Sequence, residues 1–441
     1  MSILNLCVEI LQEIGNELSN TGQKNLRAAC RYTDYAVAPL FFSSVVLKSS
    51  DLRRESSIWG MSRLASGRSG WSTHAKTLEI VPGAQNGEEG EWELGSHISE
   101  AAVQELFSSA LRSLSNVRSV IWAETEDDPS WQCDVISDYL RSLPLLTSLE
   151  LSLQRAEDFA LPLLSGLRNL KIANPHWLPI HLTHPDSRAI ARSSGLTSLN
   201  LSGFHDCATA SAQLWSTLLE RDIRLREITT TSVSPDLITY LASYSGVEKL
   251  VMRGLGGGHF DLSNELAVLF YETVLPQHAD SLVELACPTT HENNWSFGAH
   301  NAGAIAKLRA LTKLFIGVNA QDVVNADPGN SALDILFNTV AGLPGLHIIA
   351  VSACHTSPHR AAVEAAILLA MRSQRPSTTQ QSYQLNPVED DGDDAEPEPA
   401  PAPVVPPAQS IIRVHYDWSF EQWVKLFVYL CFMRLYKSML Q

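Results

Sequence analysis

A short apolar motif that recurs along the chain constrains the fold more than any other feature. Residues 146–151 read LTSLEL, and residues 196–201 read LTSLNL. The segment 167–172 has the same L-x-x-L-x-L spacing, and looser copies begin at Val117, Leu225, Val247, Leu282, Leu311 and Leu346. In each copy apolar and polar residues alternate, which predicts a short strand with one buried face. Residues 77–81 predict a further strand ahead of these copies.

The distance between copies predicts a unit of one strand and one helix. Successive copies begin 21 to 35 residues apart, which leaves room for a helix in most units. Apolar residues at helical spacing predict helices at 98–114, 132–143, 156–165, 207–221, 235–244, 262–277, 300–310, 331–342 and 359–373. Strands joined by right-handed helical crossovers form a parallel sheet. A unit that buries its apolar face only against its neighbours is typical of a solenoid.

This spacing resembles that of leucine-rich repeats. The resemblance implies an α/β fold, with a curved parallel sheet inside and helices outside. The family places Asn or Cys three residues beyond the last strand leucine, and only Asn319 and Cys354 match that pattern. We therefore expect an irregular leucine-rich-repeat solenoid over residues 75–375.

Composition excludes several classes of partner. The chain has 32 Lys and Arg against 48 Asp and Glu, a formal net charge of −16, and no basic run. Nucleic acids and anionic membranes require a basic footprint, so we expect neither as a partner. No segment reaches the roughly 20 apolar residues that span a bilayer, so no membrane span is expected.

Cysteine usage and the N-terminus indicate a reducing compartment. The seven cysteines are scattered, with no C-x-x-C pair, which favours free thiols over disulfides or zinc ligands. Glu9 and Glu13 interrupt the first apolar stretch, which argues against a secretory signal. We expect a cytoplasmic or nuclear protein, or one found in both compartments.

Residues 1–47 follow a helical rather than a strand pattern. Ile10, Leu11, Ile14 and Leu18 recur at helical spacing, and a second apolar face begins with Leu26, Ala29 and Cys30. About 45 residues of short helices is close to the size below which a hydrophobic core cannot sustain itself. Such a module tends to complete its core on another surface, which favours a binding function.

These residues resemble an F-box, as found at the start of many fungal F-box-like proteins. The family pattern L-P-x-E-I-L corresponds to LCVEIL at 6–11, and L-x-x-x-C-R corresponds to LRAACR at 26–31. The pattern ends near P-x-L-F, which corresponds to PLF at 39–41. Cys7 replaces the family's proline, and the acidic residue before the second helix is absent.

The resemblance implies a function for both parts of the chain. F-box proteins bind the Skp adaptor of cullin–RING ubiquitin ligases through this helical module, while a downstream repeat domain holds the protein substrate. The chain would be a non-catalytic substrate-recruiting subunit. The adaptor-facing residues implied by the resemblance are Leu6, Cys7, Glu9, Ile10, Leu11, Ile14, Leu26, Cys30, Pro39 and Leu40. A leucine-rich-repeat scaffold without ligase association is the alternative, which the Cys7 substitution favours.

Alternation along the strands predicts which residues face a bound substrate. The inner face of the curved sheet would present polar and charged side chains of both signs, which suits recognition of a protein surface. These residues are Ser148, Glu150, Asn169, Lys171, Ser198, Asn200, Glu227, Lys249, Arg253, Glu284, Lys313 and Phe315.

The sequence gives no motif for catalysis, a cofactor or a metal. The glycine-rich stretch 254–259 is not followed by the Lys-Ser/Thr pair of a P-loop, and no G-x-S-x-G elbow occurs. Cys354 lies near His355 and His359, and Cys287 near His291, but neither group has a second half at zinc spacing. We expect a non-enzymatic protein without cofactors.

The chain divides into five expected segments. The helical module (1–47) is followed by a connecting helix and loop (48–74) and by the solenoid (75–375). The segment 376–410 has no positive charge before Arg413 and is rich in acid and proline, which predicts disorder. Residues 411–441 predict a last strand and a helix that caps the array, with a membrane-surface helix as the alternative.

Overall fold

The structure is a computed structural model that describes most of the chain up to residue 373. The described residues are 6–49, 52, 55–82, 98–125, 127–153, 164–173, 190, 192–202, 208–253, 255, 260–289, 291–327, 329–353 and 359–373. Several expectations fall outside these residues. They are the acidic segment 376–410, the last strand and helix within 411–441, Cys354 with His355, and most of the helix expected at 156–165.

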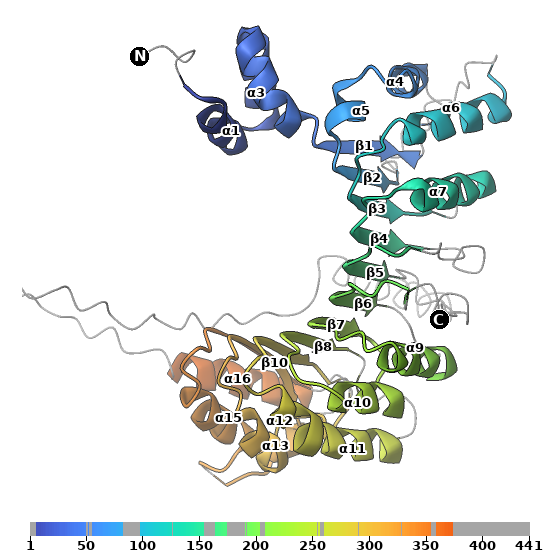
Figure 1. The fold of residues 1–441 in the computed structure, drawn as a ribbon. Helices are drawn as coiled ribbons and strands as arrows, with labels where there is room; N and C mark the ends of the chain where they lie inside the picture. Colours follow the sequence, from blue (N-terminus) through green and yellow to red (C-terminus); the bar gives the residue numbers. More distant parts are fainter. Residues whose placement is uncertain are drawn as a thin grey trace, which may run out of the picture.

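One parallel sheet of eleven strands organises the described chain. The strands follow one another in the sheet in the same order as in the sequence. They are β1 (Ser44–Lys48), β2 (Thr77–Val81), β3 (Ser119–Ala123), β4 (Ser148–Ser152), β5 (Asn169–Ala173), β6 (Ser198–Ser202), β7 (Glu227–Thr230), β8 (Lys249–Met252), β9 (Glu284–Cys287), β10 (Lys313–Val318) and β11 (Ile348–Ala353). The fold is therefore α/β with an open parallel sheet, as Figure 1 shows.

The nine expected L-x-x-L-x-L copies all form strands, and so does the segment 77–81. Each of the nine strands begins two residues after the first residue of its motif, so equivalent residues of successive motifs pair in register. Ser148 pairs with Asn169, and Asn169 pairs with Ser198.

One strand was not expected. β1 pairs in parallel with β2, Val45 beside Leu78, so the sheet already begins within the expected helical module 1–47. β1 carries only a short Val-Val-Leu run and none of the leucine spacing, which is why the repeat pattern missed it.

The helices that follow β1 in the sequence run along one face of the sheet (Figure 1). They are α4 (Glu55–Ala65), α5 (Gly70–His74), α6 (Glu100–Arg112), α7 (Ser130–Ser142), α9 (Ala208–Glu220), α10 (Pro235–Ala242), α11 (Phe260–Leu269), α12 (Leu275–Gln277), α13 (Ala299–Ile305), α14 (Ala320–Val324), α15 (Ala332–Ala341) and α16 (Arg360–Ser373). A π-helical turn, Phe270–Val274, joins α11 to α12. In β3, β4 and β6 every second residue is buried, and the others stay partly exposed. The face opposite the connecting helices is called the open face below.

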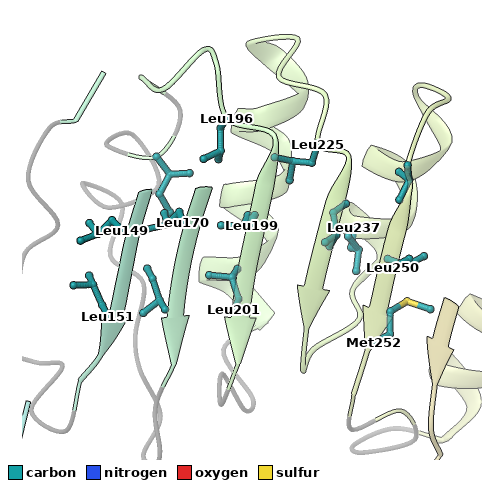
Figure 2. Packing of buried hydrophobic residues seen from close by; sticks show 14 of the residues in the cluster. Leu149, Leu151, Leu170, Leu196, Leu199, Leu201, Leu225, Leu237, Leu250 and Met252 are labelled. Carbon is teal, nitrogen blue, oxygen red and sulfur yellow. The ribbon is translucent and has the colours of Figure 1, made fainter. Parts of the chain in front are cut away.

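The hydrophobic core lies between the sheet and these helices (Figure 2). Leu149, Leu170, Leu199 and Ile228 occupy equivalent positions on β4 to β7, and none is more than 1% exposed. Full burial of such a side chain contributes about 1.5–3 kcal/mol. The core therefore gains its stability from layers that repeat along the sheet, each resting on its neighbours.

Buried tyrosines anchor the turns by which helices lead into strands. Tyr139 donates to the carbonyl of Leu114 at 3.0 Å, and Tyr240 donates to the carbonyl of Ile223 at 2.7 Å. The Tyr240 hydroxyl also accepts from the amide of Leu225 at 3.1 Å. Burial raises the pKa of both phenols, so they act as neutral hydrogen-bonding groups.

His278 has the same role one repeat further on. It is 1% exposed, its Nδ1 accepts from the amide of Val247 at 3.3 Å, and its Nε2 donates to the carbonyl of Leu241 at 3.1 Å. This arrangement requires the neutral ring, because Nδ1 accepts. Burial lowers the pKa of His278 below its ordinary value.

We expect this histidine to make stability pH-dependent. The unfolded chain binds the proton more readily than the folded chain, so the stabilisation is complete above about pH 6.5 and is lost as the pH falls toward the lowered folded pKa. Within that window the loss reaches at most about 1.4 kcal/mol per pH unit. Urea unfolding at several pH values should show a shallower acid slope for His278→Asn than for the wild type. The exposed His347→Asn serves as the control, and an unchanged slope in His278→Asn would contradict this role.

Candidate partner-binding surfaces

Three short helices ahead of the sheet form a small unit, here called the head. They are α1 (Val8–Glu17), α2 (Asn20–Ala29) and α3 (Arg31–Phe41). Only Leu11, Ala36 and Val37 make up its buried hydrophobic cluster, which is separate from the core of the sheet. Side chains tie the helices together: Gln12 donates to the carbonyl of Ala36 at 3.2 Å, and Gln23 donates to that of Gly15 at 2.9 Å. So small a core leaves the head dependent on such bonds.

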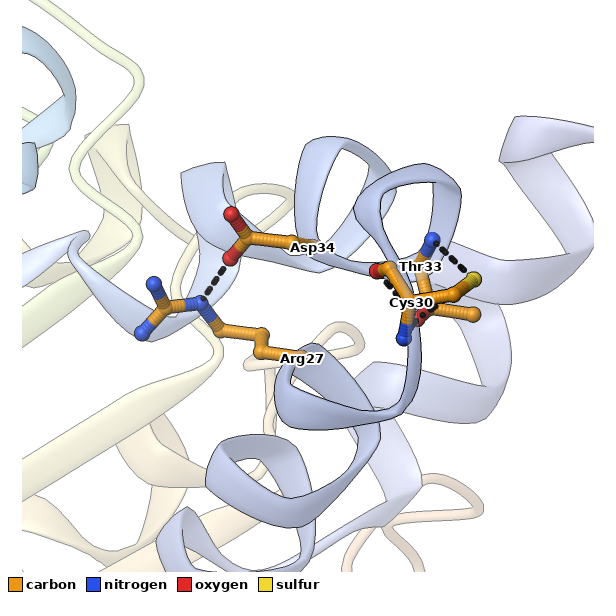
Figure 3. Close-up of polar contacts among 4 residues, drawn as sticks. All are labelled: Arg27, Cys30, Thr33 and Asp34. Atoms are coloured by element: carbon orange, nitrogen blue, oxygen red, sulfur yellow. Dashed lines mark hydrogen bonds and ion pairs between the residues drawn. The ribbon is translucent and has the colours of Figure 1, made fainter.

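Cys30 holds the corner between α2 and α3 (Figure 3). Its backbone is extended, and its sulfur accepts from the amide of Thr33 at 3.5 Å. In return the Thr33 hydroxyl oxygen accepts from the amide of Cys30 at 3.2 Å, which completes a capping box. The contacts to Thr33 lower the pKa of the Cys30 thiol. Cys30 therefore has a structural role in the head.

Arg27 fixes the other side of the same corner. Its Nε lies 2.8 Å from Oδ1 of Asp34 (Figure 3). Its guanidinium lies over the rings of Phe41 and Phe42, 4.5 and 4.1 Å from the two centroids. Phe42 in turn packs edge-on against Trp71 of α5 at 4.9 Å. This chain of contacts joins the head to the first connecting helices of the sheet.

An apolar stripe runs along the outer side of α1. Ile10 is 47% exposed, Ile14 37% and Leu18 36%. They are spaced by four residues, so they lie on one side of the helix and its C-terminal end. Three large aliphatic residues are therefore exposed on a unit with a three-residue core, which makes this side a candidate surface for a partner.

The other residues implied by the F-box resemblance are distributed around this stripe. Cys7, the residue before α1, and Glu9 are exposed, and Pro39 and Leu40 are half-buried on α3. Hydrogen bonds to its own backbone amide and to the Cys7 thiol lower the pKa of Glu9. Leu6 and Leu26 pack partly buried against the head core.

Leu11 does not belong to the exposed surface that the F-box resemblance implies. Its side chain is fully buried between α1 and α3, against Ala36 and Val37. It lies about 100° around the axis of α1 from Ile10 and about 60° from Ile14, on the part of the helix that packs against α3. Ile10 and Ile14 are therefore accessible from outside the head, and Leu11 is not.

Two exposed tyrosines at the start of α3 are not part of the F-box pattern, so the sequence did not predict them as surface residues. Tyr35 is 73% exposed, and Tyr32 is 37% exposed. The Tyr32 hydroxyl donates to the carbonyl of Leu6 at 2.9 Å, which brings α3 next to the start of α1. Tyrosine is enriched at protein interfaces because it combines a large apolar area with a polar tip. In the sequence, the signal that could have found them is two tyrosines directly after the Cys30-Arg31 pair.

The open face of the sheet brings together the predicted substrate-binding residues. Successive strands place the first-position residues in one row, running from Ser148 to Asn169, Ser198, Glu227, Lys249, Glu284 and Lys313. Ion pairs cross this face. Glu284 lies 3.3 Å from Lys249 and 3.4 Å from Lys313, and Glu150 pairs with Lys171. Ser198 donates to Glu227 at 3.0 Å.

Toward β11 the open face becomes more apolar than the sequence predicted. Val251, Ala286, Phe315 and Ala350 lie at equivalent positions on β8 to β11. Val251, Ala286 and Ala350 are 6–7% exposed, and Phe315 is half-buried. β8, β9 and β11 carry apolar residues on both faces of the sheet. Alternation alone therefore did not predict on which face Val251, Ala286 and Ala350 lie.

Among the residues that the structure describes, those suggested for metal or thiol chemistry form no metal-binding group. The described part of the chain contains no group of three His, Cys, Asp or Glu placed to hold a metal ion. Cys287 is fully buried, and burial raises the pKa of its thiol, which disfavours the thiolate needed for nucleophilic attack. Of the glycine-rich stretch 254–259, only Leu255 is described, where it forms an isolated bridge with Thr289.

None of the described helices combines the length and the apolar character needed to span a bilayer. Comparison with models of protein families and with curated proteins gave no match to this chain.

Proposed function

We propose that the chain is a non-catalytic substrate-recruiting subunit of a Skp–cullin–F-box ubiquitin ligase. In this proposal the head is an F-box-like module that binds the Skp adaptor, and the sheet with its helices is an irregular leucine-rich-repeat solenoid. The single observation that supports it most is the stripe Ile10, Ile14 and Leu18, exposed on a head with three fully buried apolar residues. The compartment would be the cytoplasm or nucleus, where such ligases work.

The stripe suits a partner that completes an interior. Burial of a large aliphatic side chain contributes about 1.5–3 kcal/mol, so covering two or three half-exposed ones contributes a few kcal/mol. Tyr32 and Tyr35 add an aromatic border at the start of α3. Glu9, Glu13 and Glu17 add exposed carboxylates along α1, which favours a partner with complementary basic groups at its rim.

The open face supports the second half of the proposal. Eleven strands about 4.8 Å apart give a surface on the order of 48 Å long, enough for a protein segment or domain. Charges of both signs along it, already paired with one another, favour specificity over strong nonspecific attraction. Phe315 lies among the small apolar residues Val251, Ala286 and Ala350 and is a candidate anchor for an apolar side chain of the substrate.

A binding assay with the purified Skp adaptor tests the proposal. We expect the intact chain to copurify with the adaptor and Ile10→Asp/Ile14→Asp to reduce the affinity at least about 100-fold, equivalent to about 2.7 kcal/mol. Both side chains are exposed, so the variant should fold normally. Leu369→Asp is the matched control, because Leu369 on α16 is 71% exposed and distant from the head in sequence and fold. No binding by the intact chain, or equal binding by all three proteins, would contradict the proposal.

A leucine-rich-repeat scaffold without ligase association is the second candidate, and Cys7 favours it. Cys7 stands immediately before α1 with φ −69°, and its side chain makes no capping hydrogen bond. Proline adopts this φ readily, so Cys7→Pro restores the family residue without backbone strain. Adaptor binding by Cys7→Pro but not by the natural chain would support the scaffold.

A further inference from the structure

A continuous row of residues lies one position before the strands, along the edge at which they begin. Each backbone amide in the row donates to the preceding member's carbonyl, at 2.7–3.1 Å. The members from β2 to β11 are Lys76, Arg118, Thr147, Arg168, Thr197, Arg226, Glu248, Val283, Thr312 and His347. We call this the strand-entry row.

The first six members of the row carry four positive charges and no negative one. Lys76, Arg118, Arg168 and Arg226 are all exposed. Arg226 pairs with Glu248 at 3.2 Å, whereas Lys76, Arg118 and Arg168 form no ion pair within the described part of the chain. With strands about 4.8 Å apart, the four cations extend over roughly 24 Å. On a chain with a net charge of −16, this edge is a local positive surface.

Helix ends do not account for these cations. Arg112 and Arg141 lie in the last turns of α6 and α7, where a positive charge balances the helix dipole. Neither residue belongs to the strand-entry row. Arg118 and Arg168 instead stand at strand entries, held by the backbone ladder. Both side chains are exposed, and no carboxylate among the described residues pairs with them.

The chain leaves the described structure beside the last strand of the sheet. α16 packs against β11 and ends at Ser373, the last described residue. Residues 374–388 provide 15 positions before the acidic segment 389–398. Fifteen residues reach up to about 50 Å, whereas β11 and β7 are roughly 19 Å apart across the sheet.

We propose that residues 389–398 bind the strand-entry row of the same molecule. The segment holds Glu389, Asp390, Asp391, Asp393, Asp394, Glu396 and Glu398 and no positive charge. Extended, ten residues span up to about 33 Å, which covers the roughly 24 Å of the four cations. Single exposed ion pairs are weak, but the tether holds the segment at an effective concentration on the order of millimolar.

This contact goes beyond the proposed function and does not depend on adaptor binding. The strand-entry row borders the open face, since Arg118 and Arg168 directly precede the open-face residues Ser119 and Asn169. A bound acidic segment would therefore occupy one border of that face and exclude other acidic peptides from it.

Carbodiimide cross-linking of the full chain tests the proposal, because this reagent joins a lysine to a carboxylate in direct contact. Lys76 is the one lysine of the row. We expect monomers to contain links from Lys76 to residues 389–398. The yield should fall at least fivefold in Arg118→Gln/Arg168→Gln and should also fall when salt shortens the screening length from about 30 Å to about 3 Å.

The control changes two exposed cations away from the row, Lys24→Gln/Arg63→Gln, and should leave the yield unchanged. A second chain with all seven carboxylates of 389–398 changed to amides should bind a labelled peptide of residues 386–400 at least tenfold more tightly than the natural chain does. Absence of Lys76 links in monomers, links confined to dimers, or equal peptide binding by the two chains would overturn the proposal.

Discussion

Leu199→Ala is expected to reduce the free energy of unfolding by about 2–5 kcal/mol, since truncating a buried leucine removes its transfer energy and leaves a cavity. Leu199 is 1% exposed on β6, between Leu170 and Ile228 on the adjacent strands. Because each layer of the core rests on its neighbours, the damage should be greatest in β5 to β7. Denaturant unfolding gives the total loss, and hydrogen–deuterium exchange gives its location.

Asn169→Ala is the matched control for this effect. Asn169 lies on the adjacent strand β5 but is exposed on the open face, so its truncation should change stability by less than about 0.5 kcal/mol. Equal losses for the two variants would contradict the assignment of the two faces of the sheet.

The second large effect concerns the junction between the head and the sheet. A Cβ added at Gly70, the first residue of α5, would overlap the ring of Phe42. That ring lies under the guanidinium of Arg27 and against Trp71, so its displacement disturbs the contacts that join the head to α5. We expect Gly70→Ala to cost about 1–3 kcal/mol, as overpacking does. Faster amide exchange in α1 to α3 than in the wild type would show that the head is held less firmly.

Gly60→Ala separates overpacking from the general effect of alanine. A Cβ at Gly60, inside α4, has no neighbour within 4 Å, and alanine favours a helix over glycine by about 0.5–1 kcal/mol. This variant should therefore gain stability while Gly70→Ala loses it. A loss in Gly60→Ala, or head exchange unaffected in Gly70→Ala, would contradict the described junction.

The leucine spacing predicted most of the sheet because it states, residue by residue, which side chains are buried. Leu149 and Leu199 repeat the same local environment, so one rule applies to every unit. β1 lacked that spacing and takes part only because β2 lies beside it. Pairing of this kind depends on tertiary contacts, which a local pattern does not contain.

The candidate surfaces were predicted less completely. Helical spacing grouped Ile10 and Ile14, which are exposed, with Leu11, which is buried, since the packing of α3 decides which side of α1 is buried. The role of Cys30 depends on its extended backbone and on Thr33. The strand-entry row was missed because its members are from 21 to 42 positions apart in sequence, and only the register of the strands places them together.

The central claim is that the head binds an adaptor while the open face remains free for a substrate. Hydrogen–deuterium exchange of the full chain with and without the purified Skp adaptor tests it most directly. We predict slower exchange in α1 and α3, around Ile10, Ile14 and Tyr35, with no change in β2 to β11. Unchanged exchange in the head, or protection confined to the strands of the open face, would contradict it.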